Sequence, residues 1–147
     1  MAQVTARTER TIDAPAERVR AALADYETVR PTILTEHYRD YRVESGGQGA
    51  GTRAHWLLQA TQKRVRDQLV EVSVPGPDRI VERDANSSMV TTWTVTPAGE
   101  ARSVVTVESA WNGAGGIGGF FERTFAPKGL QRIHDGVLAK LADAVRG

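Results

Sequence analysis

The sequence contains no cysteine, which excludes disulfide bonds, thiolate catalysis and cysteine-bound zinc. It also lacks a membrane-spanning run, because the uncharged stretch Ser109–Phe121 is rich in glycine and shorter than the roughly 20 apolar residues that such a helix needs. The first twenty residues include Arg7, Glu9, Arg10 and Asp13 and no apolar run of seven residues. No secretory signal is visible, so we expect a cytoplasmic protein without stable membrane insertion.

Neither sign of charge dominates, since 19 basic and 18 acidic residues give a net charge of +1. No run of Lys and Arg is interleaved with aromatic residues, so we expect no nucleic-acid partner. The three histidines, His37, His55 and His134, are far apart and show none of the spacings typical of metal ligands. We therefore expect no metal and no cofactor.

The 147 residues are 40% hydrophobic and 25% charged, values that are ordinary for a globular protein. A chain of this length buries roughly 68 to 70% of its unfolded surface and needs no disulfide or metal to fold. We expect one domain over residues 1–147 that exists as a monomer or a homodimer.

The first third of the chain predicts a strand followed by short helices. Alternation over Val4–Ile12 favours the strand, and Asp13 is expected to cap a helix of about twelve residues that starts near Pro15. Pro31 limits this helix, and a second short turn is expected over Thr32–Leu34. The inner face of the first helix follows from i, i+3, i+4, i+7 spacing: Val19, Ala22, Leu23 and Tyr26.

The middle of the chain predicts further strands joined by turns. In one of them the apolar residues change parity between Leu69 and Val70, which predicts a bulge that would bend the strand. A glycine-rich hairpin loop is expected at residues 46–51. The expected strands are Tyr38–Glu44, Thr52–Gln59, Lys63–Val74, Arg79–Ala85, Met89–Thr96 and Arg102–Trp111.

The last part of the chain predicts a long amphipathic helix after a glycine-rich hinge at residues 113–119, with a kink or break near Pro127. A long helix facing many antiparallel strands favours one curved sheet that wraps around it and encloses a cavity. The apolar face of this helix carries Leu130, Ile133, His134, Val137, Leu138, Leu141 and Val145.

Two segments resemble the polyketide cyclase/dehydrase-like branch of the START and birch-pollen-allergen-like (SRPBCC) superfamily. Residues Thr11–Val19, leading to the pair Asp25 and Tyr26, resemble the family's opening strand and helix. Residues Trp93–Pro97, with Gly99 and the strand beyond it, are similar to the family's penultimate hairpin.

The resemblance implies an α+β helix-grip fold: a curved antiparallel sheet of about six to seven strands around a long C-terminal helix, with one or two short helices after the first strand. It also implies binding or transport of a hydrophobic small molecule, such as a lipid or polyketide, between sheet and helix. The alternative is a polyketide aromatase/cyclase or dehydratase that uses the same cavity. A third possibility that the sequence leaves open is an interaction module or homodimer subunit without a pocket. No catalytic motif carries over, so catalytic residues stay unknown.

Candidate ligand-binding residues are large apolar side chains on the expected inner faces, together with two histidines that strand or helix parity could turn inward. His37, Arg10, Asp67 and Glu71 are further polar residues that could point inward by the same parity, although each is as readily solvated. The candidate set is Tyr41, His55, Trp56, Leu69, Met89, Trp93, Val107, Trp111, Phe121, Phe125, Leu130, His134 and Val137.

Residues Gly113–Gly118 match the dinucleotide-binding pattern G-x-G-x-x-G. A dinucleotide fold needs a following parallel strand that ends in an acidic residue, whereas here only a helix remains before the chain stops. We interpret the glycines as a hinge, with a gate for the cavity as the less favoured alternative.

Overall fold

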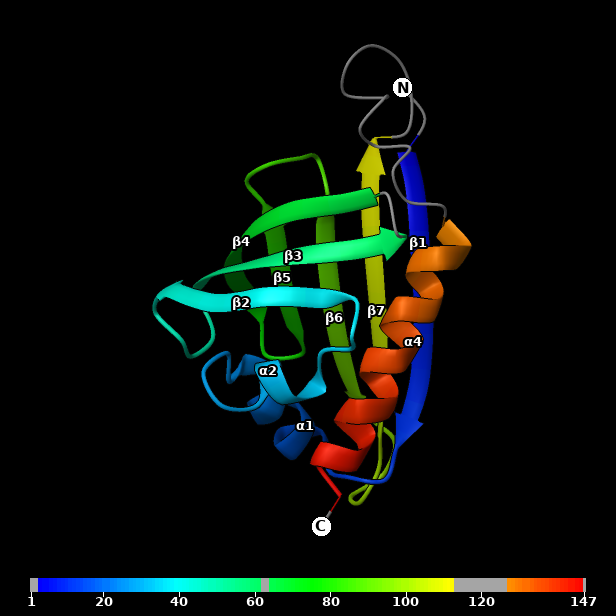
Figure 1. The fold of residues 1–147 in the computed structure, drawn as a ribbon. Coiled ribbons are helices and arrows are strands. Elements are labelled where there is room, and N and C mark those ends of the chain that lie inside the picture. Colours follow the sequence, from blue (N-terminus) through cyan, green and yellow to red (C-terminus); the bar gives the residue numbers. More distant parts are fainter. Residues whose placement is uncertain (1–2, 62–63, 113–126, 147) are drawn as a thin grey trace.

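The computed structural model describes residues 3–61, 64–112 and 127–146. In this part of the chain one strand is followed by two short helices, six strands and a long helix (Figure 1). The bounds are β1 (Gln3–Ile12), α1 (Ala16–Ala24), α2 (Arg30–Ile33), β2 (Tyr38–Ser45), β3 (Arg53–Thr61), β4 (Arg64–Gly76), β5 (Arg79–Asp84), β6 (Val90–Pro97), β7 (Ser103–Asn112) and α4 (Pro127–Ala144).

The seven strands form one antiparallel sheet in the order β1-β7-β6-β5-β4-β3-β2. In Figure 1, β2 and β3 run crosswise to β1 and β7, so the sheet bends over on itself. Helix α4 lies along β1 and β7, and α1 and α2 lie near the C-terminal end of α4. The structure confirms the predicted α+β helix-grip fold.

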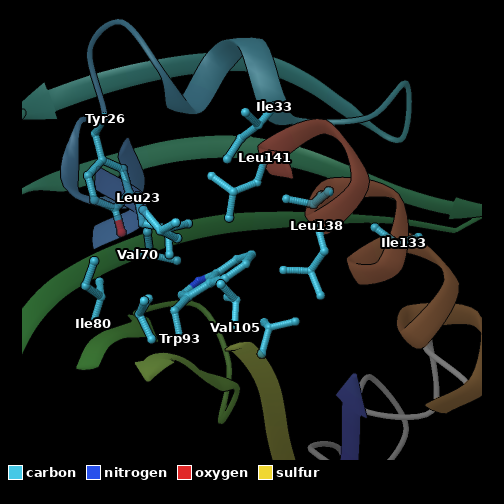
Figure 2. Packing of buried hydrophobic residues seen from close by; sticks show 14 of the residues in the cluster. Leu23, Tyr26, Ile33, Val70, Ile80, Trp93, Val105, Ile133, Leu138 and Leu141 are labelled. Atoms are coloured by element: carbon cyan, nitrogen blue, oxygen red, sulfur yellow. The ribbon is translucent and has the colours of Figure 1, made fainter. Parts of the chain in front are cut away.

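The core lies between the inner face of the sheet and the apolar face of α4. Val105, Val107 and Trp111 of β7 are buried, which confirms the inner face expected from their alternation. Figure 2 shows Leu138 and Leu141 of α4 pointing toward the side chains of the sheet. The helix therefore contributes a continuous apolar stripe to the core.

The predicted bulge between Leu69 and Val70 is wrong. The β3–β4 register runs without a break from Arg53 opposite Glu71 to Gln59 opposite Val65. The apolar residues change parity because two inward positions of β4, at residues 66 and 68, are buried and polar. Register shifts occur elsewhere in the sheet: between Gln59 and Thr61, between Ser73 and Gly76, and at two places in β2.

The predicted capping role of Asp13 is also wrong. Helix α1 begins after Pro15 without a side-chain cap, and the Asp13 carboxylate instead accepts a hydrogen bond from Arg102 Nε at 2.8 Å. The helix has nine residues rather than about twelve, because the backbone becomes extended at Asp25. Tyr26 is nevertheless fully buried, as its place in the apolar spacing predicts.

The glycine-rich loop at residues 46–51 packs against the end of α1. Tyr26 N–H donates to Gly47 O at 2.9 Å, and Gly49 N–H donates to Ala24 O at 2.8 Å. Gly47 has a φ of 135°, a backbone conformation that residues with a side chain rarely adopt, so glycine is favoured there. These hydrogen bonds fix the backbone at the end of α1, next to the site described below.

The glycine hinge at residues 113–119 and the G-x-G-x-x-G match lie outside the described residues. The described part of the terminal helix begins at Pro127 and has 18 residues.

Candidate functional site

A small cavity lies between the sheet, α2 and α4. Its volume is about 20 Å³, which is room for about one water molecule. Aromatic rings from β2, β3 and β6 form part of its wall, and five polar side chains complete it. The polar set is Arg30, Gln68, Glu82, Thr91 and His134.

The strongest polar interaction at the cavity joins α2 to β5. Arg30 Nη1 lies 2.8 Å from Glu82 Oε2, and the two side chains are only 2% and 4% exposed. Arg30 Nε donates to Leu23 O at 2.9 Å, and Nη2 donates to the hydroxyl of Tyr26 at 3.1 Å. Each guanidinium nitrogen therefore has a partner, which offsets the cost of burying the charge.

The carboxylate of Glu82 also accepts hydrogen bonds at both of its oxygen atoms. The Tyr26 hydroxyl donates to Oε2 at 2.5 Å, and Trp93 Nε1 donates to Oε1 at 3.0 Å. Burial raises the pKa of Tyr26 well above its usual value, so this hydroxyl stays protonated and remains a donor. The guanidinium carbon of Arg30 also lies 4.4 Å from the ring centroid of Tyr26 and 4.9 Å from that of Trp93.

A second group of side chains centres on Trp56 of β3. Its Nε1 donates to Gln68 Oε1 at 2.7 Å, and Gln68 Nε2 contacts the sulfur of Met89 at 3.3 Å. Tyr41 stacks on the indole with a centroid distance of 6.0 Å, and Tyr38 meets it edge-on at 5.9 Å. These contacts fix a rigid aromatic wall on the side of β2 and β3.

His134 of α4 forms the opposite wall. Its Nε2 lies 2.8 Å from Ser109 Oγ, and Ser109 Oγ lies 2.6 Å from Thr91 Oγ1. The imidazole is 4% exposed and meets Trp93 in a T-shaped contact at 6.1 Å. Among the described residues, Nδ1 has no hydrogen-bond partner.

Burial lowers the pKa of His134 to about 4, and the negative charge of Glu82 opposes that effect only in part. The imidazole is therefore neutral at pH 7. A neutral imidazole carries one N–H donor and one acceptor nitrogen, so it can hold a polar atom of a ligand or move a proton.

The structure brings four of the predicted ligand-binding residues to the cavity wall: Trp56, Met89, Trp93 and His134. Tyr41 packs behind Trp56. Four others are buried in the core without lining the cavity: Val107, Trp111, Leu130 and Val137.

His55 and Leu69 do not reach the cavity, because both lie on the outer face of the sheet, opposite each other in the β3–β4 register. His55 Nε2 lies 2.8 Å from the carboxylate of Asp67, which shares that face. The error at Leu69 follows from the misplaced bulge in β4, since a change of parity moves a side chain to the other face. His55 faces outward because its neighbour Trp56 takes the inner face of β3. Phe121 and Phe125 lie outside the described residues.

The other polar residues considered from the sequence also lie away from the cavity. Arg10 is exposed at the edge of the sheet and lies 4.0 Å from Asp135 of α4. Glu71 is exposed, and His37 Nδ1 contacts the hydroxyl of Thr35 at 3.0 Å. None of these three side chains lines the cavity.

Sequence reasoning missed the polar half of the wall, above all Arg30 and Glu82. A signal was present in β5, where Glu82 shares strand parity with the buried residues Ile80 and Asp84. Ser109 gave the same signal in β7, where it follows Val105 and Val107 on the inner face. A polar residue at an inward position is unfavourable unless it has a partner, so such positions point to a network.

Comparison with known proteins identifies the family. Residues 3–146 match the family described as polyketide cyclase/dehydrase and lipid transport. The chain belongs to this family. The match spans nearly the whole chain and confirms the resemblance to the START-like superfamily.

Solved structures agree with this membership. The solution structure of the KanY protein (ms6282) is 54% identical, with full coverage of both chains and a TM-score of 0.89. TTHA0849 from Thermus thermophilus is 23% identical, with 97% of each chain covered and a TM-score of 0.74. The Zhui aromatase/cyclase from Streptomyces sp. R1128 is 12% identical, with 98% of this chain and 94% of that one covered and a TM-score of 0.74. None of the curated proteins matches the chain.

Two further observations concern the described residues alone. Their helices include none with both the length and the apolar character needed to cross a membrane. Within the same residues, no group of three or more His, Cys, Asp or Glu side chains is placed to hold a metal ion.

Neutralising Glu82 should destabilise the fold strongly. In Glu82→Gln the buried guanidinium of Arg30 loses its counter-charge, and breaking a buried pair in this way costs about 3–5 kcal/mol. Urea denaturation followed by circular dichroism measures the change in the free energy of unfolding. The matched control is Glu44→Gln, which breaks the surface pair with Arg42 and should cost less than about 1 kcal/mol. Equal losses in the two variants would contradict the prediction.

Acid should weaken the fold through His134. Because burial holds the pKa at about 4 in the folded chain, against 6.5 for a free histidine, the unfolded chain binds this proton more readily. The free energy of unfolding is therefore highest above pH 6.5 and falls as the pH drops from 6.5 to about 4. At about 1.4 kcal/mol per pKa unit, the wild type should lose about 3 kcal/mol more than His134→Gln over this range. Urea titrations at several pH values test this, and a pH-independent difference between the two proteins would refute it.

Proposed function

We propose that the protein binds or carries a hydrophobic small molecule between its curved sheet and helix α4. The observation that carries the proposal is the construction of the cavity wall, where rigid rings of Trp56 and Trp93 meet buried polar groups. Such a combination is typical of ligand pockets, in which apolar area gives affinity and a few polar atoms give orientation. The family description, which includes lipid transport, supports this function.

The cavity is too small for a ligand unless the structure changes on binding. Pockets for drug-sized ligands have volumes of about 300–1,000 Å³, whereas the cavity bordered by described residues has about 20 Å³. A ligand must therefore displace side chains or shift an element of the wall. The aromatic wall on β3 and the ion pair of α2 are tightly held, whereas α4 contributes only His134 to the wall among the described residues. We propose that α4 moves outward when the ligand enters.

The energetics permit this opening. Each 100 Å² of apolar ligand surface removed from water contributes about 2.5 kcal/mol. Part of that gain opposes the cost of moving α4 and of immobilising the ligand. We propose that flat, polycyclic molecules suit the site best, because they stack on indole rings and bury a large area with few internal rotations.

A bulky residue at the rim should block binding. Leu34 lines the cavity, is half-buried and directly follows α2, so tryptophan at this position would fill the space with little strain on the core. We expect Leu34→Trp to weaken the affinity for fluorene, a flat tricyclic hydrocarbon, at least tenfold by isothermal titration calorimetry. In the matched control Leu57→Trp, the new ring is on the outer face of β3 and the affinity should not change. No binding of fluorene or of a co-purified lipid to the wild type would refute the proposed function.

The second candidate function is an aromatase/cyclase or dehydratase that uses the same cavity. The neutral imidazole of His134 at the wall favours it, because it can polarise a carbonyl group or accept a proton. In that case His134→Gln should lose turnover of a polyketone substrate at least a hundredfold, well beyond any loss of affinity for it. If the wild type binds the polyketone but does not convert it, the result would contradict the enzymatic function and support the carrier function.

A further inference from the structure

The hydroxyl groups of half-buried Thr91 in β6 and fully buried Ser109 in β7 form a short chain of hydrogen bonds that ends on His134. Thr91 and Ser109 lie opposite each other in the β6–β7 register, with their oxygen atoms 2.6 Å apart. Ser109 is fully buried, and its oxygen is also 2.8 Å from His134 Nε2. Neither hydroxyl group has another side-chain or backbone partner among the described residues.

The number of unpaired donors and acceptors in this series of hydrogen bonds differs between the two neutral forms of the imidazole, which carry the ring proton on Nδ1 or on Nε2. In the first form, Thr91 donates to Ser109, Ser109 donates to Nε2, and the ring proton is on Nδ1. Only Nδ1–H then lacks a partner. In the second form, Nε2–H donates to Ser109 and Ser109 donates to Thr91, so the Thr91 proton and the Nδ1 lone pair both lack partners.

The first form is favoured because it gives both hydroxyl protons an acceptor, whereas the second form leaves the proton of the half-buried Thr91 without one in addition to the unpaired Nδ1. Each such group costs about 1–3 kcal/mol when it is removed from water. The low pKa of His134 keeps the ring neutral, so the doubly protonated form does not compete at pH 7. The imidazole at the cavity wall therefore carries a donor that has no acceptor among the described residues.

We infer that His134 Nδ1–H binds an oxygen acceptor of the ligand, and that the ligand is a flat, mostly apolar molecule with a carbonyl group at its α4 end. This inference rests on the proposed function. A carbonyl oxygen suits the position better than a hydroxyl group, because it needs only a donor, whereas a hydroxyl proton would need a second partner. A volume of about 20 Å³ beside the imidazole accommodates one oxygen atom.

The first experiment compares fluorene with 9-fluorenone, which has the same three rings and one added carbonyl group. The wild type should bind fluorenone about five to ten times more tightly than fluorene, the factor expected for one buried hydrogen bond. Equal affinities for the two compounds would overturn the inference and leave the proposed function intact. Binding of neither compound would instead refute the proposed function.

Two variants separate the nitrogen atoms of the ring. The amide of His134→Gln reaches the position of Nε2 and can keep the bond to Ser109, but it leaves nothing at Nδ1. The shorter amide of His134→Asn places a donor near the position of Nδ1. We expect the preference for fluorenone to disappear in the glutamine variant and to persist in the asparagine variant. The same preference in both variants, or in neither, would overturn the inference.

A measurement on the wild type without ligand tests directly which nitrogen atom of His134 carries the ring proton. It does not require any variant to fold. Nitrogen-15 NMR correlations to the ring protons of His134 report which nitrogen atom carries the proton. We expect the Nδ1–H form in the wild type at pH 7. Observation of the Nε2–H form would overturn the inference whatever the binding experiments show.

Discussion

The carboxylate of Glu82 is the point at which separate segments of the chain are tied together. It accepts bonds from Tyr26 and Trp93 and pairs with Arg30, which in turn bonds to the end of α1. Strands β5 and β6, the end of α1 and helix α2 therefore share one buried network. A network of this kind is stable only when every member has its partner, so the segments must adopt their positions together.

This requirement shapes the cavity. The short helices cannot shift without breaking a buried ion pair, and the rings of Tyr41 and Trp56 stack on the neighbouring side. Helix α4 has a different attachment: within the described part of the chain, its polar contact with the cavity wall is the bond between His134 and Ser109, and the rest of its inner face is an apolar stripe. Apolar contacts are not directional, so a shift of α4 breaks one hydrogen bond at the cavity wall and leaves the buried ion pair of Arg30 and Glu82 intact.

The sequence pattern predicts the fold well because strand alternation and helical spacing report which faces are apolar. It locates α4, where the inner residues are nearly all hydrophobic, and β7, where Val105, Val107 and Trp111 mark the inner face. It fails in β4, where Arg66 and Gln68 occupy inner positions, and this failure placed Leu69 on the wrong face in the prediction. Asp13 failed as a predicted cap because Arg102, distant in the sequence, competes for its carboxylate.

The candidate site was only half predictable for a related reason. Large apolar residues such as Trp93 and Met89 are indicated by their strand parity, and parity also places Glu82 at an inward position, but parity does not identify the partner of a buried charge. Arg30 and Glu82 are far apart in sequence, and nothing local to either residue indicates that they meet. Pairing of this kind is set by the tertiary fold, so sequence periodicity contains no signal for it.

The two polar groups at the cavity therefore have different consequences for specificity. The nitrogen atoms of Arg30 all have partners within the chain, and a ligand that recruited them would have to compete with Glu82, Tyr26 and a backbone carbonyl. His134 has a nitrogen atom without a partner among the described residues and belongs to α4, the element that we propose moves when a ligand enters. A hydrogen bond to His134 would form while the helix is displaced and would move with it as the site closes. On this proposal, specificity for an oxygen-bearing ligand is coupled to closure of the cavity, and the buried network around Glu82 provides the fixed surface against which that closure occurs.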